Sequence, residues 1–566
     1  MVMKRERMIR TSVAPRALAL AVAGVFAGVA SAEAGVWCYR PYEYEAWMLQ
    51  RMRAEADRGV LHFSYPGKFL RLEAEPSAFY SESPVDGYEA IPGAPGVPPH
   101  RLERPSAEMK ATCRDGVYDL GHLDIGYVYA TAGERPNLFV GESLPEVRNS
   151  DANGFEQSVL MVPDGAPGRW RSDIPLALRY FRFGNRYTSC SFRSQVDWRE
   201  PAGRFACGDA RKEKAWRLGA ETLRLCTRTF TLDAIKRDRL PWAGDLAVHL
   251  LSEAYTFGDP EPIKRTLAAL GSGDMTQGHV NGIAAFSLWW VISHDLLQRH
   301  FGETAYLRLH YPKIKARMAE IATHEDGRGF FAKDLGWDFM DWLNRKGGSL
   351  KSEITRQVIY FGALRAAERL AKRTGDGESA TAWAAKAERL KAEILKAGMD
   401  RTRHARMLAI VFDLVDGETA RRYAAEIAAD DLPPTVTPYM STFEVMALAK
   451  AGESAAALRK FESVWGEMVD FGVDAYWEGW DHADKGAEIY EYYGRPFGKS
   501  LCHAWASGPA FLIPGVFLGV RPTADGWAAW EAKPAIPAFA PEATVVVPKK
   551  GGPLTVTFQG GKPVGR

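Results

Sequence analysis

The most constraining feature of this 566-residue chain is a helical period that begins after Lys212 and continues for about three hundred residues. Within it, apolar residues recur at intervals of three and four, the spacing of one face of an α-helix. Two such series are Trp383, Ala387, Leu390 and Ile394, and Leu458, Phe461, Trp465 and Met468. So many stripes in succession predict a long array of helices packed on a shared core.

Short polar links separate these helical segments, for example at 374–376, 416–417 and 452–454. Links of two or three residues make successive helices antiparallel hairpins. A long array of such hairpins predicts a helical toroid, which we assign to residues 213–518.

The chain before this region reads as β-structure. From 33 to 212, short stretches alternate apolar and polar residues, as between Leu123 and Tyr129, and clusters of Gly, Pro, Asn and Asp interrupt them. This pattern predicts an antiparallel β-sandwich, with the Pro- and Gly-rich run 90–99 as a surface loop.

The last segment, 519–566, returns to strands at 544–547 and 554–558. A segment of this length is too short for a core of its own. We expect a small β-unit that packs on the helical region.

The first 32 residues have the order of a secretory signal peptide. Basic residues come first, an apolar run extends from Ala17 to Ala30, and Ala30-Ser31-Ala32 supplies a cleavage signal before Glu33. The alternative is a membrane anchor, but the apolar run has fourteen residues and a spanning helix needs about twenty. The leader predicts a periplasmic or secreted protein.

Charge excludes some partners. The leader contains five of the 72 basic and one of the 70 acidic residues, so the mature chain has 67 against 69 and a net charge near −2. This balance predicts neither a nucleic-acid partner nor an anionic lipid surface. No later segment approaches eighteen uncharged apolar residues, so we expect no membrane contact after cleavage.

Six cysteines follow the leader without any C-x-x-C pair, which removes the spacing of zinc ribbons and thioredoxin-like sites. In an oxidising compartment Cys190 could close a hairpin with Cys207, and Cys38 could pair with Cys113. Six cysteines allow 15 connectivities, so these pairings stay open.

The segment from Asp233 to Asp245 gathers three acids and three cations around one tryptophan, directly before a helical run. The acids are Asp233, Asp238 and Asp245, and the tryptophan is Trp242. Hydrolysis of a glycosidic bond needs one protonated carboxyl group and one carboxylate. The segment fits half of such a site, and it equally fits a salt-bridged helix start capped by Asp245.

A second segment places Glu478 between Trp477 and Trp480. Aromatic faces beside an acid suit a sugar ring, whose C–H face stacks on them while its hydroxyls reach the carboxylate. The alternative is a buried tryptophan pair with Glu478 pointing outward.

Other chemistries lack their motifs. The chain has no G-x-S-x-G, H-E-x-x-H or G-x-x-x-x-G-K-[ST] sequence, so we expect neither a metal nor another cofactor. Cys502-His503 suggests a thiol nucleophile, but adjacent side chains rarely face each other, which favours a buried Cys beside a polar His.

With these segments in view, the chain resembles the α-L-rhamnosidases of glycoside hydrolase family 78 from about Trp216 to Thr523. The similar stretches are 236–245, Gly278-His-Val-Asn-Gly-Ile283, Asp341-Trp342, Tyr476-Trp-Glu478, Cys502-His-Ala-Trp505 and Gly519-Val-Arg-Pro-Thr523. The resemblance implies an (α/α)₆ barrel flanked by β-domains, and an exo-acting, inverting enzyme that releases terminal α-L-rhamnose from glycosides or polysaccharide fragments.

The resemblance also implies roles for individual residues. Asp238 matches the general acid and Glu478 the general base. The remaining matches are sugar-binding or pocket-lining positions: Asp233, Trp242, Asp245, Asp341, Trp342 and His503. Trp477 is expected to line the pocket with Trp242 and Trp342, which would favour the methyl group of rhamnose.

One residue departs from the family pattern, which has Glu directly after the Arg where this chain has Asp238 after Arg237. The acid is shorter by one methylene, so either its loop lies closer to the leaving oxygen or another acid donates the proton.

Two alternatives stay open. Lys236, Arg237 and Arg239 would suit a uronic acid, as in an unsaturated-uronyl hydrolase or a polysaccharide lyase on the same toroid. A non-catalytic carbohydrate-binding protein would keep the groove without the reaction.

Overall fold

The computed structural model describes residues 108–149, 159–173, 175–228, 230–236, 239, 241–271 and 278–564. The predicted signal peptide, Cys38, the loop at 90–99 and the first part of the predicted sandwich lie outside these residues. Within the described ranges, no helix combines the length and apolar character needed to cross a membrane.

Six helices of the described chain form a closed inner ring. In chain order they are α7 (Ala243–Glu253), α9 (Ala284–Phe301), α11 (Glu353–Thr374), α13 (Arg403–Val411), α15 (Pro438–Ala451) and α18 (Pro509–Phe511), which continues into η6 (Leu512–Phe517). Each contacts the next, and α18 contacts α7, which closes the ring.

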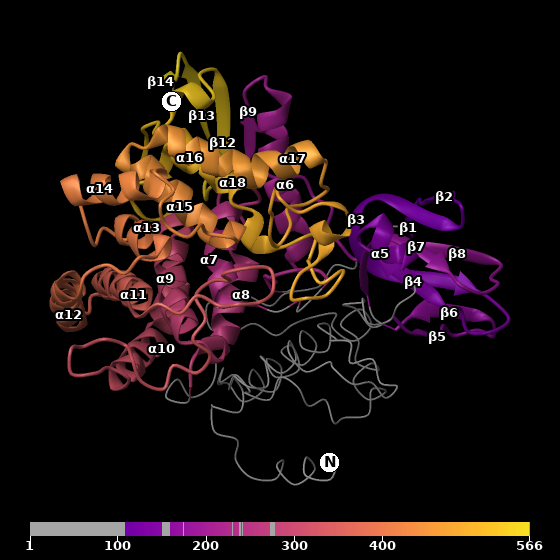
Figure 1. The fold of residues 1–566 in the computed structure, drawn as a ribbon, viewed down its shortest axis with the longest axis horizontal. Coiled ribbons are helices and arrows are strands. Elements are labelled where there is room, and N and C mark those ends of the chain that lie inside the picture. The colour runs from indigo at the N-terminus through magenta and orange to yellow at the C-terminus, as the bar shows by residue number, and fades with distance from the viewer. Residues whose placement is uncertain are drawn as a thin grey trace, which may run out of the picture.

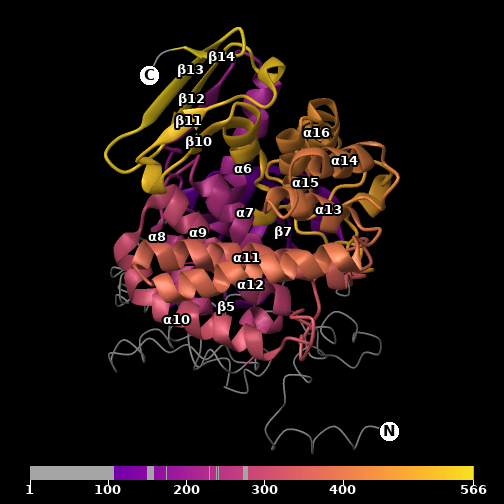
Figure 2. The same ribbon diagram turned by 90° about the vertical axis from the view of Figure 1, so that its left-hand side faces the viewer.

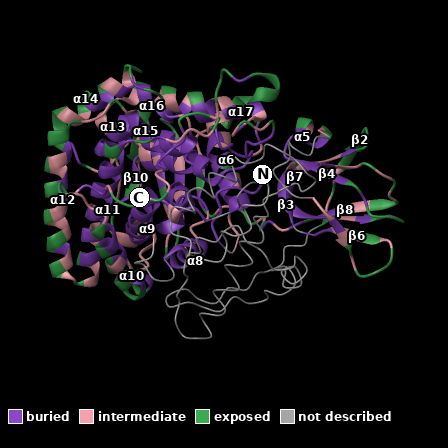
Figure 3. Ribbon diagram, turned by 60° about the horizontal axis from the view of Figure 1, so that its bottom comes forward, coloured by how far each residue is buried: buried purple, intermediate pink, exposed green. Residues whose placement is uncertain are grey.

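A second helix precedes each inner helix and lies outside it. These outer helices are α6 (Ala210–Cys226), α8 (Glu261–Leu270), α10 (Thr304–Thr323), α12 (Gly377–Ala397), α14 (Gly417–Ala428) and α16 (Ser454–Phe461), which continues through η3 (Glu462–Gly466) into α17 (Glu467–Phe471). Every residue of α7 is buried, whereas α12 buries a single stripe. Figure 3 shows this contrast between the inner helices and the outer edge. The predicted (α/α)₆ barrel is confirmed.

The three predicted links join α11 to α12, α13 to α14 and α15 to α16. Gly375 and Gly452 end α11 and α15 with φ values of 84° and 94°, a conformation that favours glycine. Asp376 then starts α12, because its side chain accepts a hydrogen bond from the backbone N–H of Ser379. Stop and start signals within three residues reverse the chain into a hairpin.

Because each hairpin is antiparallel, all six inner helices run in the same direction and begin at the same end of the barrel. A helix N-terminus carries a partial positive charge and unpaired N–H groups. This end of the barrel is therefore suited to carboxylates.

An antiparallel sheet lies beside the barrel (Figure 1). Its long central strand β3 (Val117–Thr131) pairs with β2, β6, β7 and β8, with a register shift between Asp119 and Asp124. The other strands are β1 (Glu108–Met109), β2 (Thr112–Arg114), β4 (Leu138–Gly141), β5 (Met161–Pro163), β6 (Arg169–Ser172), β7 (Leu176–Phe183) and β8 (Ser189–Ser194). The alternating pattern between Leu123 and Tyr129 thus lies on β3, as predicted.

The two faces of this sheet have different neighbours. Leu176 and Leu178 of β7 belong to the core of the sheet, whereas Ala177 between them and Ile125 of β3 join the core of the barrel. This is the two-residue period of a strand. The sheet is therefore packed against the barrel and fixes loops at the barrel's edge.

The C-terminal strands form two small sheets, which lie at the upper left of Figure 2, above α6 to α9. One contains β10 (Val520–Pro522) and β11 (Trp530–Ala532). The other has the order β14 (Lys562–Val564), β13 (Leu554–Gln559), β12 (Ala543–Val547) and β9 (Arg204–Ala206). The predicted strands at 544–547 and 554–558 are confirmed. Strand β9, directly before α6, also joins this sheet, so the two ends of the helical region meet there.

The cysteines correct one expectation. The structure joins none of the described cysteines, Cys113, Cys190, Cys207, Cys226 and Cys502, by a disulfide bond. Cys190 lies in β8 of the first sheet, whereas Cys207 follows β9, which pairs with the C-terminal strand β12. The suggested hairpin disulfide between Cys190 and Cys207 is wrong, because the two strands belong to different sheets.

Candidate active site

Glu478 lies fully buried at the barrel end where the inner helices begin. Its Oε1 accepts a hydrogen bond from the Tyr493 hydroxyl at 2.8 Å, and its Oε2 accepts one from the backbone N–H of Ser500 at 3.1 Å. The indole N–H of Trp505 donates to the backbone carbonyl of the same residue at 2.9 Å. Glu478 therefore points inward, held on both oxygens, and the outward orientation considered for it is wrong.

His503 and Asp245 form a second buried polar pair, with Nε2 and Oδ1 3.1 Å apart. Burial raises the pKa of Asp245, the hydrogen bond from His503 opposes this shift, and the charge of Glu478 adds to it. Asp245 lies in the first turn of α7, where the helix dipole favours its ionised form. The pKa of Asp245 is thus set by opposing effects, because burial and Glu478 raise it and His503 lowers it.

The start of α7 is set by a residue from another hairpin. Trp242 occupies the N-cap position but makes no side-chain capping bond. Instead Asn281, in the η2 turn (Val280–Gly282), accepts a hydrogen bond from the N–H of Ala243 at 3.0 Å and donates to the carbonyl of Pro241 at 3.2 Å. The Gly-His-Val-Asn-Gly segment therefore supports the turn that carries Trp242 and Asp245.

Asp233 is also buried, and its backbone is joined to the segment of His503. Its carbonyl accepts a hydrogen bond from the N–H of Ala504 at 2.6 Å, and Ala234 forms a β-bridge with His503. Two segments that are far apart in the sequence are thereby held side by side.

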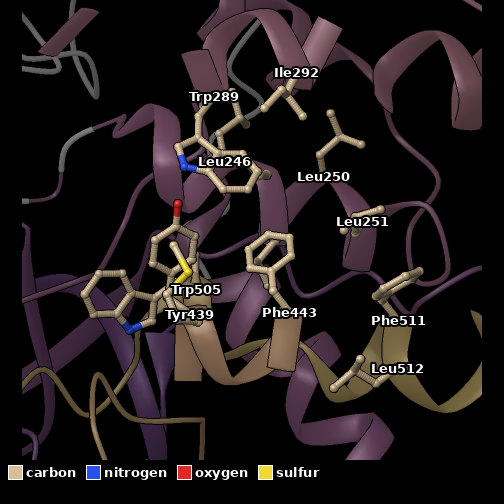
Figure 4. Packing of buried hydrophobic residues seen from close by; sticks show 14 of the residues in the cluster. Leu246, Leu250, Leu251, Trp289, Ile292, Tyr439, Phe443, Trp505, Phe511 and Leu512 are labelled. Carbon is tan, nitrogen blue, oxygen red and sulfur yellow. The ribbon is translucent and has the colours of Figure 1, made fainter. Parts of the chain in front are cut away.

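These side chains surround one pocket, whose empty volume, counted together with the solvent at its mouth, is about 390 Å³. Its lining combines acids with many aromatic rings: Asp233, Trp242, Asp245, Ile283, Phe286, Trp337, Phe339, Trp342, Glu478, Tyr493, His503 and Trp505. Trp505 stacks on Tyr439 of α15 with ring centroids 5.7 Å apart (Figure 4). Rigid rings around three carboxyl groups suit a sugar, with apolar faces to stack on and polar ends to bind.

Six predicted residues line this pocket, and two do not. Asp341 is fully buried beneath it, where it accepts a hydrogen bond from Thr437 at 2.6 Å and contacts His404 at 2.8 Å. Asp341 is therefore hydrogen-bonded on both carboxylate oxygens and does not line the pocket. Trp477 does not line the pocket, and its ring packs on Phe471 instead, with ring centroids 5.4 Å apart.

The predicted general acid, Asp238, lies outside the described residues, as does Arg237. Their neighbour Lys236 is buried in an ion-pair cluster, with its Nζ 3.1 Å from Glu142 and 3.2 Å from Glu146. Arg239 is equally buried and donates to the carbonyl of Pro175 at 2.9 Å. Neither cation lines the pocket, so neither supports the uronic-acid alternative in the way that the sequence suggested.

Tyr493 is the most important residue that the sequence pattern did not mark. It lies in a polar loop, and its backbone has a φ of 54°, unusual for a bulky residue. Its N–H donates to the carbonyl of Arg345 at 2.6 Å, which holds this conformation and directs the hydroxyl toward Glu478. The run Tyr490-Glu-Tyr-Tyr493 was the only available signal.

A larger cavity lies at the same end of the barrel, beside the starts of α13 and α15, with an empty volume of about 1820 Å³. Its lining includes Leu343, Gly479 and Tyr492, the chain neighbours of the pocket residues Trp342, Glu478 and Tyr493. The same three segments therefore border both the pocket and this recess.

Among the described residues, no group of three or more His, Cys, Asp or Glu side chains is placed so that it could hold a metal ion.

The comparisons with known proteins agree with this fold. A family model for the bacterial alpha-L-rhamnosidase 6 hairpin glycosidase domain matches residues 200–514. The fold is similar to that of the GH78 family rhamnosidase of Bacillus sp. GL1, with a TM-score of 0.64 and 21% identity over 80% of this chain and 52% of that one. A search of curated proteins finds no match.

Two further solved structures have the same fold. The rhamnosidase from Klebsiella oxytoca with rhamnose bound has a TM-score of 0.61 and 21% identity over 72% of this chain and 94% of that one. The native α-L-rhamnosidase from Aspergillus terreus has a TM-score of 0.67 and 18% identity over 82% of this chain and 59% of that one. The present chain thus spans little more than half of the Bacillus and Aspergillus proteins.

Proposed function

Because this chain belongs to the family of bacterial α-L-rhamnosidases with a six-hairpin glycosidase domain, we propose that it is an exo-acting, inverting glycoside hydrolase. It releases terminal α-L-rhamnose from glycosides or polysaccharide fragments. The observation that carries the proposal is the buried carboxylate of Glu478, which shares one aromatic pocket with Asp233, Asp245 and His503.

Glu478 is the general base. It takes a proton from a water molecule whose oxygen bonds to the anomeric carbon, on the face opposite the leaving group. The hydrogen bonds from Tyr493 and Ser500 fix the carboxylate so that it meets the water in one orientation. Inversion requires the two catalytic carboxyl groups to be about 6.5–9.5 Å apart, which leaves room for that water.

Asp238 is the general acid and gives its proton to the glycosidic oxygen as the bond to the anomeric carbon breaks. Its neighbours in the sequence, Lys236 and Arg239, are both buried and hydrogen-bonded.

Asp233, Asp245 and His503 bind the sugar hydroxyls. His503 Nδ1 is buried and has no hydrogen-bond partner among the described residues. A hydroxyl that binds this nitrogen satisfies a polar atom whose isolation costs about 1–3 kcal/mol. Trp337, Phe339 and Trp342 form the apolar wall, which suits the methyl group of rhamnose. The leaving group extends toward the charged recess next to the pocket.

Proton NMR of the sugar first released from an aryl α-L-rhamnoside tests this function. We expect α-substrate to give β-rhamnose before mutarotation. Initial release of α-rhamnose would exclude inversion. If the protein released no rhamnose but hydrolysed an unsaturated uronide, rhamnosides would be excluded as its substrates. The Asp238→Asn variant adds a test of the acid: it should lose far more activity on an alkyl rhamnoside than on a dinitrophenyl rhamnoside, whose leaving group needs no proton.

A further inference from the structure

Two buried thiols lie in contact behind the pocket. Cys226 is the last residue of α6, and Cys502 directly precedes His503. Both are completely shielded from solvent, and their Sγ atoms are 3.7 Å apart although the residues are 276 positions apart in the chain. This is the one sulfur–sulfur contact among the described cysteines.

We propose that Cys226 and Cys502 form a disulfide bond when the chain folds in an oxidising compartment. A disulfide has an S–S length of about 2.05 Å, so each sulfur needs to move by only about 0.8 Å from its present position, which small side-chain rotations can provide. The predicted leader directs the chain to such a compartment, where contacting thiols are normally oxidised. The inference does not depend on the hydrolytic function.

The reaction is thiol–disulfide exchange with a disulfide donor, such as oxidised glutathione or a protein oxidant. The Cys226 thiolate attacks the donor and releases one of its sulfurs as a thiol. The Cys502 thiolate then attacks the mixed disulfide and releases the second sulfur. Two S–H bonds of the protein are lost, the donor gains two electrons, and the two protons pass to the released thiolates.

Burial determines when this can happen. It raises the pKa of the Cys502 thiol, so the folded protein holds Cys502 as an unreactive thiol out of reach of any oxidant. Exchange therefore takes place during folding, before the last hairpin docks on the first. The bond is afterwards protected from reductants for the same reason.

The cross-link would act at the closure of the barrel. Cys226 belongs to the first hairpin, and Cys502 lies in the last one, in the segment before α18, which contacts α6 and α7. The ring of helices is otherwise closed only by non-covalent packing of the last hairpin on the first. A disulfide at that point restricts a very long loop of the unfolded chain, the case in which the loss of unfolded-state entropy is largest.

The same bond would also support the pocket. The Cys226 thiol lies 3.8 Å from the carbonyl of Asp233, and the Cys226 carbonyl accepts a hydrogen bond from the N–H of Leu232. On the other side, Cys502 is followed by His503 and Ala504, and Ala504 is bonded to Asp233. The disulfide would join the two segments that carry sugar-binding residues.

Peptide mapping of the full chain, exported by its own leader, tests the proposal. Thiols are blocked with N-ethylmaleimide in acidic denaturant, and the digest is analysed by mass spectrometry before and after reduction. We expect a linked pair of peptides, containing Cys226 and Cys502, that separates on reduction. Recovery of both cysteines as maleimide adducts before reduction would overturn the proposal.

Thermal unfolding provides a second readout. A strong reductant present during unfolding should lower the Tm of the exported protein by several degrees. The Cys226→Ala/Cys502→Ala variant should melt at one temperature with or without reductant, and the Cys113→Ser/Cys190→Ser variant should respond like the parent. An equal response in the Cys226→Ala/Cys502→Ala variant would contradict the assignment. Peptide mapping uses only the parent protein, so its result decides the question even if a variant folds poorly.

Discussion

His503 Nε2 lies 3.1 Å from Asp245 Oδ1, although the two residues are 258 positions apart. One comes from the last hairpin of the barrel and the other from the first. The other ring nitrogen of His503 has no hydrogen-bond partner among the described residues. His503 therefore orients Asp245 with one nitrogen and leaves the other for a ligand.

This arrangement predicts that His503→Phe lowers kcat/KM on an aryl rhamnoside by about 100-fold or more. The variant loses the hydrogen bond between His503 and Asp245 and leaves the buried Asp245 carboxyl group without this partner, and effects of this kind have that magnitude. Steady-state kinetics will measure it. The matched control is His122→Phe, in β3 of the first sheet and outside the lining of both the pocket and the recess. Equal effects at the two histidines would contradict the role of His503.

Replacing the base predicts the largest loss. Glu478→Gln keeps the shape of the side chain but cannot accept a proton, so kcat should fall by about 10³-fold or more. Glu467→Gln is the control, since Glu467 accepts a hydrogen bond from Trp480 at 2.7 Å and does not line the pocket. Wild-type turnover by Glu478→Gln would remove Glu478 from the mechanism.

Tyr493→Phe should give a smaller effect of the same kind. The variant loses only the hydroxyl that donates to Glu478 Oε1, so kcat should fall by about 10-fold, the value of one hydrogen bond of about 1.4 kcal/mol, with little change in KM. A change in KM alone would show that the hydroxyl binds the sugar instead.

The helical part of this fold is predictable because its signals are local. The stripe Ala387, Leu390 and Ile394 is buried in α12, and Gly375 and Asp376 stop one helix and start the next. The pairing of β9 with β12 is not predictable in this way. It depends on the whole intervening barrel, which brings two distant strands together, and neither strand specifies its partner.

The site divides along the same line. Asp245, Glu478 and His503 were predictable because they lie in dense motifs. Tyr493 was not, because its position depends on a left-handed backbone conformation and on a bond to Arg345. Trp477 looked like a pocket residue beside Glu478, but it packs on Phe471, with ring centroids 5.4 Å apart. The direction of a side chain in a loop is set by tertiary contacts.

The buried cluster of Lys236, Glu142 and Glu146 joins the first sheet to the loop of Asp238. Lys236→Met would leave two buried carboxyl groups without their cation, which costs about 3–5 kcal/mol of unfolding free energy. Burial raises the pKa of Glu146 to about 7, Lys236 opposes this, and Glu142 adds to it. Urea unfolding should therefore show a greater loss at pH 7.5 than at pH 5.5, where the unpaired acids can hold protons.

The control for this cluster is Lys236→Met combined with Glu142→Gln and Glu146→Gln, which removes all three charges. It should recover part of the stability because no unpaired charge stays buried. A single variant as stable as the parent at both pH values would show that Lys236 makes no net contribution.

Buried titratable groups also predict how stability depends on pH. Burial lowers the pKa of His249 and His294 to about 3, and burial lowers the pKa of His279 and His300 to about 4. Their ordinary pKa is about 6.5, so the unfolded chain binds more protons below that pH. The contribution of these neutral histidines to the free energy of unfolding is complete above about pH 6.5 and is lost as the pH falls toward 4.

Glu253, at the end of α7, acts in the opposite direction. Burial raises the pKa of Glu253 to about 8, and Asp259 adds to this with its charge while Arg199 and the Asp259 N–H oppose it. The folded protein thus holds a proton that the unfolded chain releases above about pH 4.5. This contribution is complete at low pH and is lost as the pH rises through 8. Together with the histidines, it predicts maximum stability near pH 6.5.

Glu253→Gln tests the alkaline side of that maximum. The amide keeps the hydrogen bond from the Asp259 N–H, 3.1 Å from Oε1, but cannot ionise. One proton released over about 1.5 pH units corresponds to about 2 kcal/mol, so the fall in unfolding free energy from pH 6.5 to 8 should shrink by about 1–2 kcal/mol. Urea unfolding across this range measures it, with the exposed Glu418→Gln as control. If the unfolding free energy of both variants falls with pH as steeply as that of the parent protein, Glu253 is ionised in the folded state. Its burial then does not cause the loss of stability above pH 6.5.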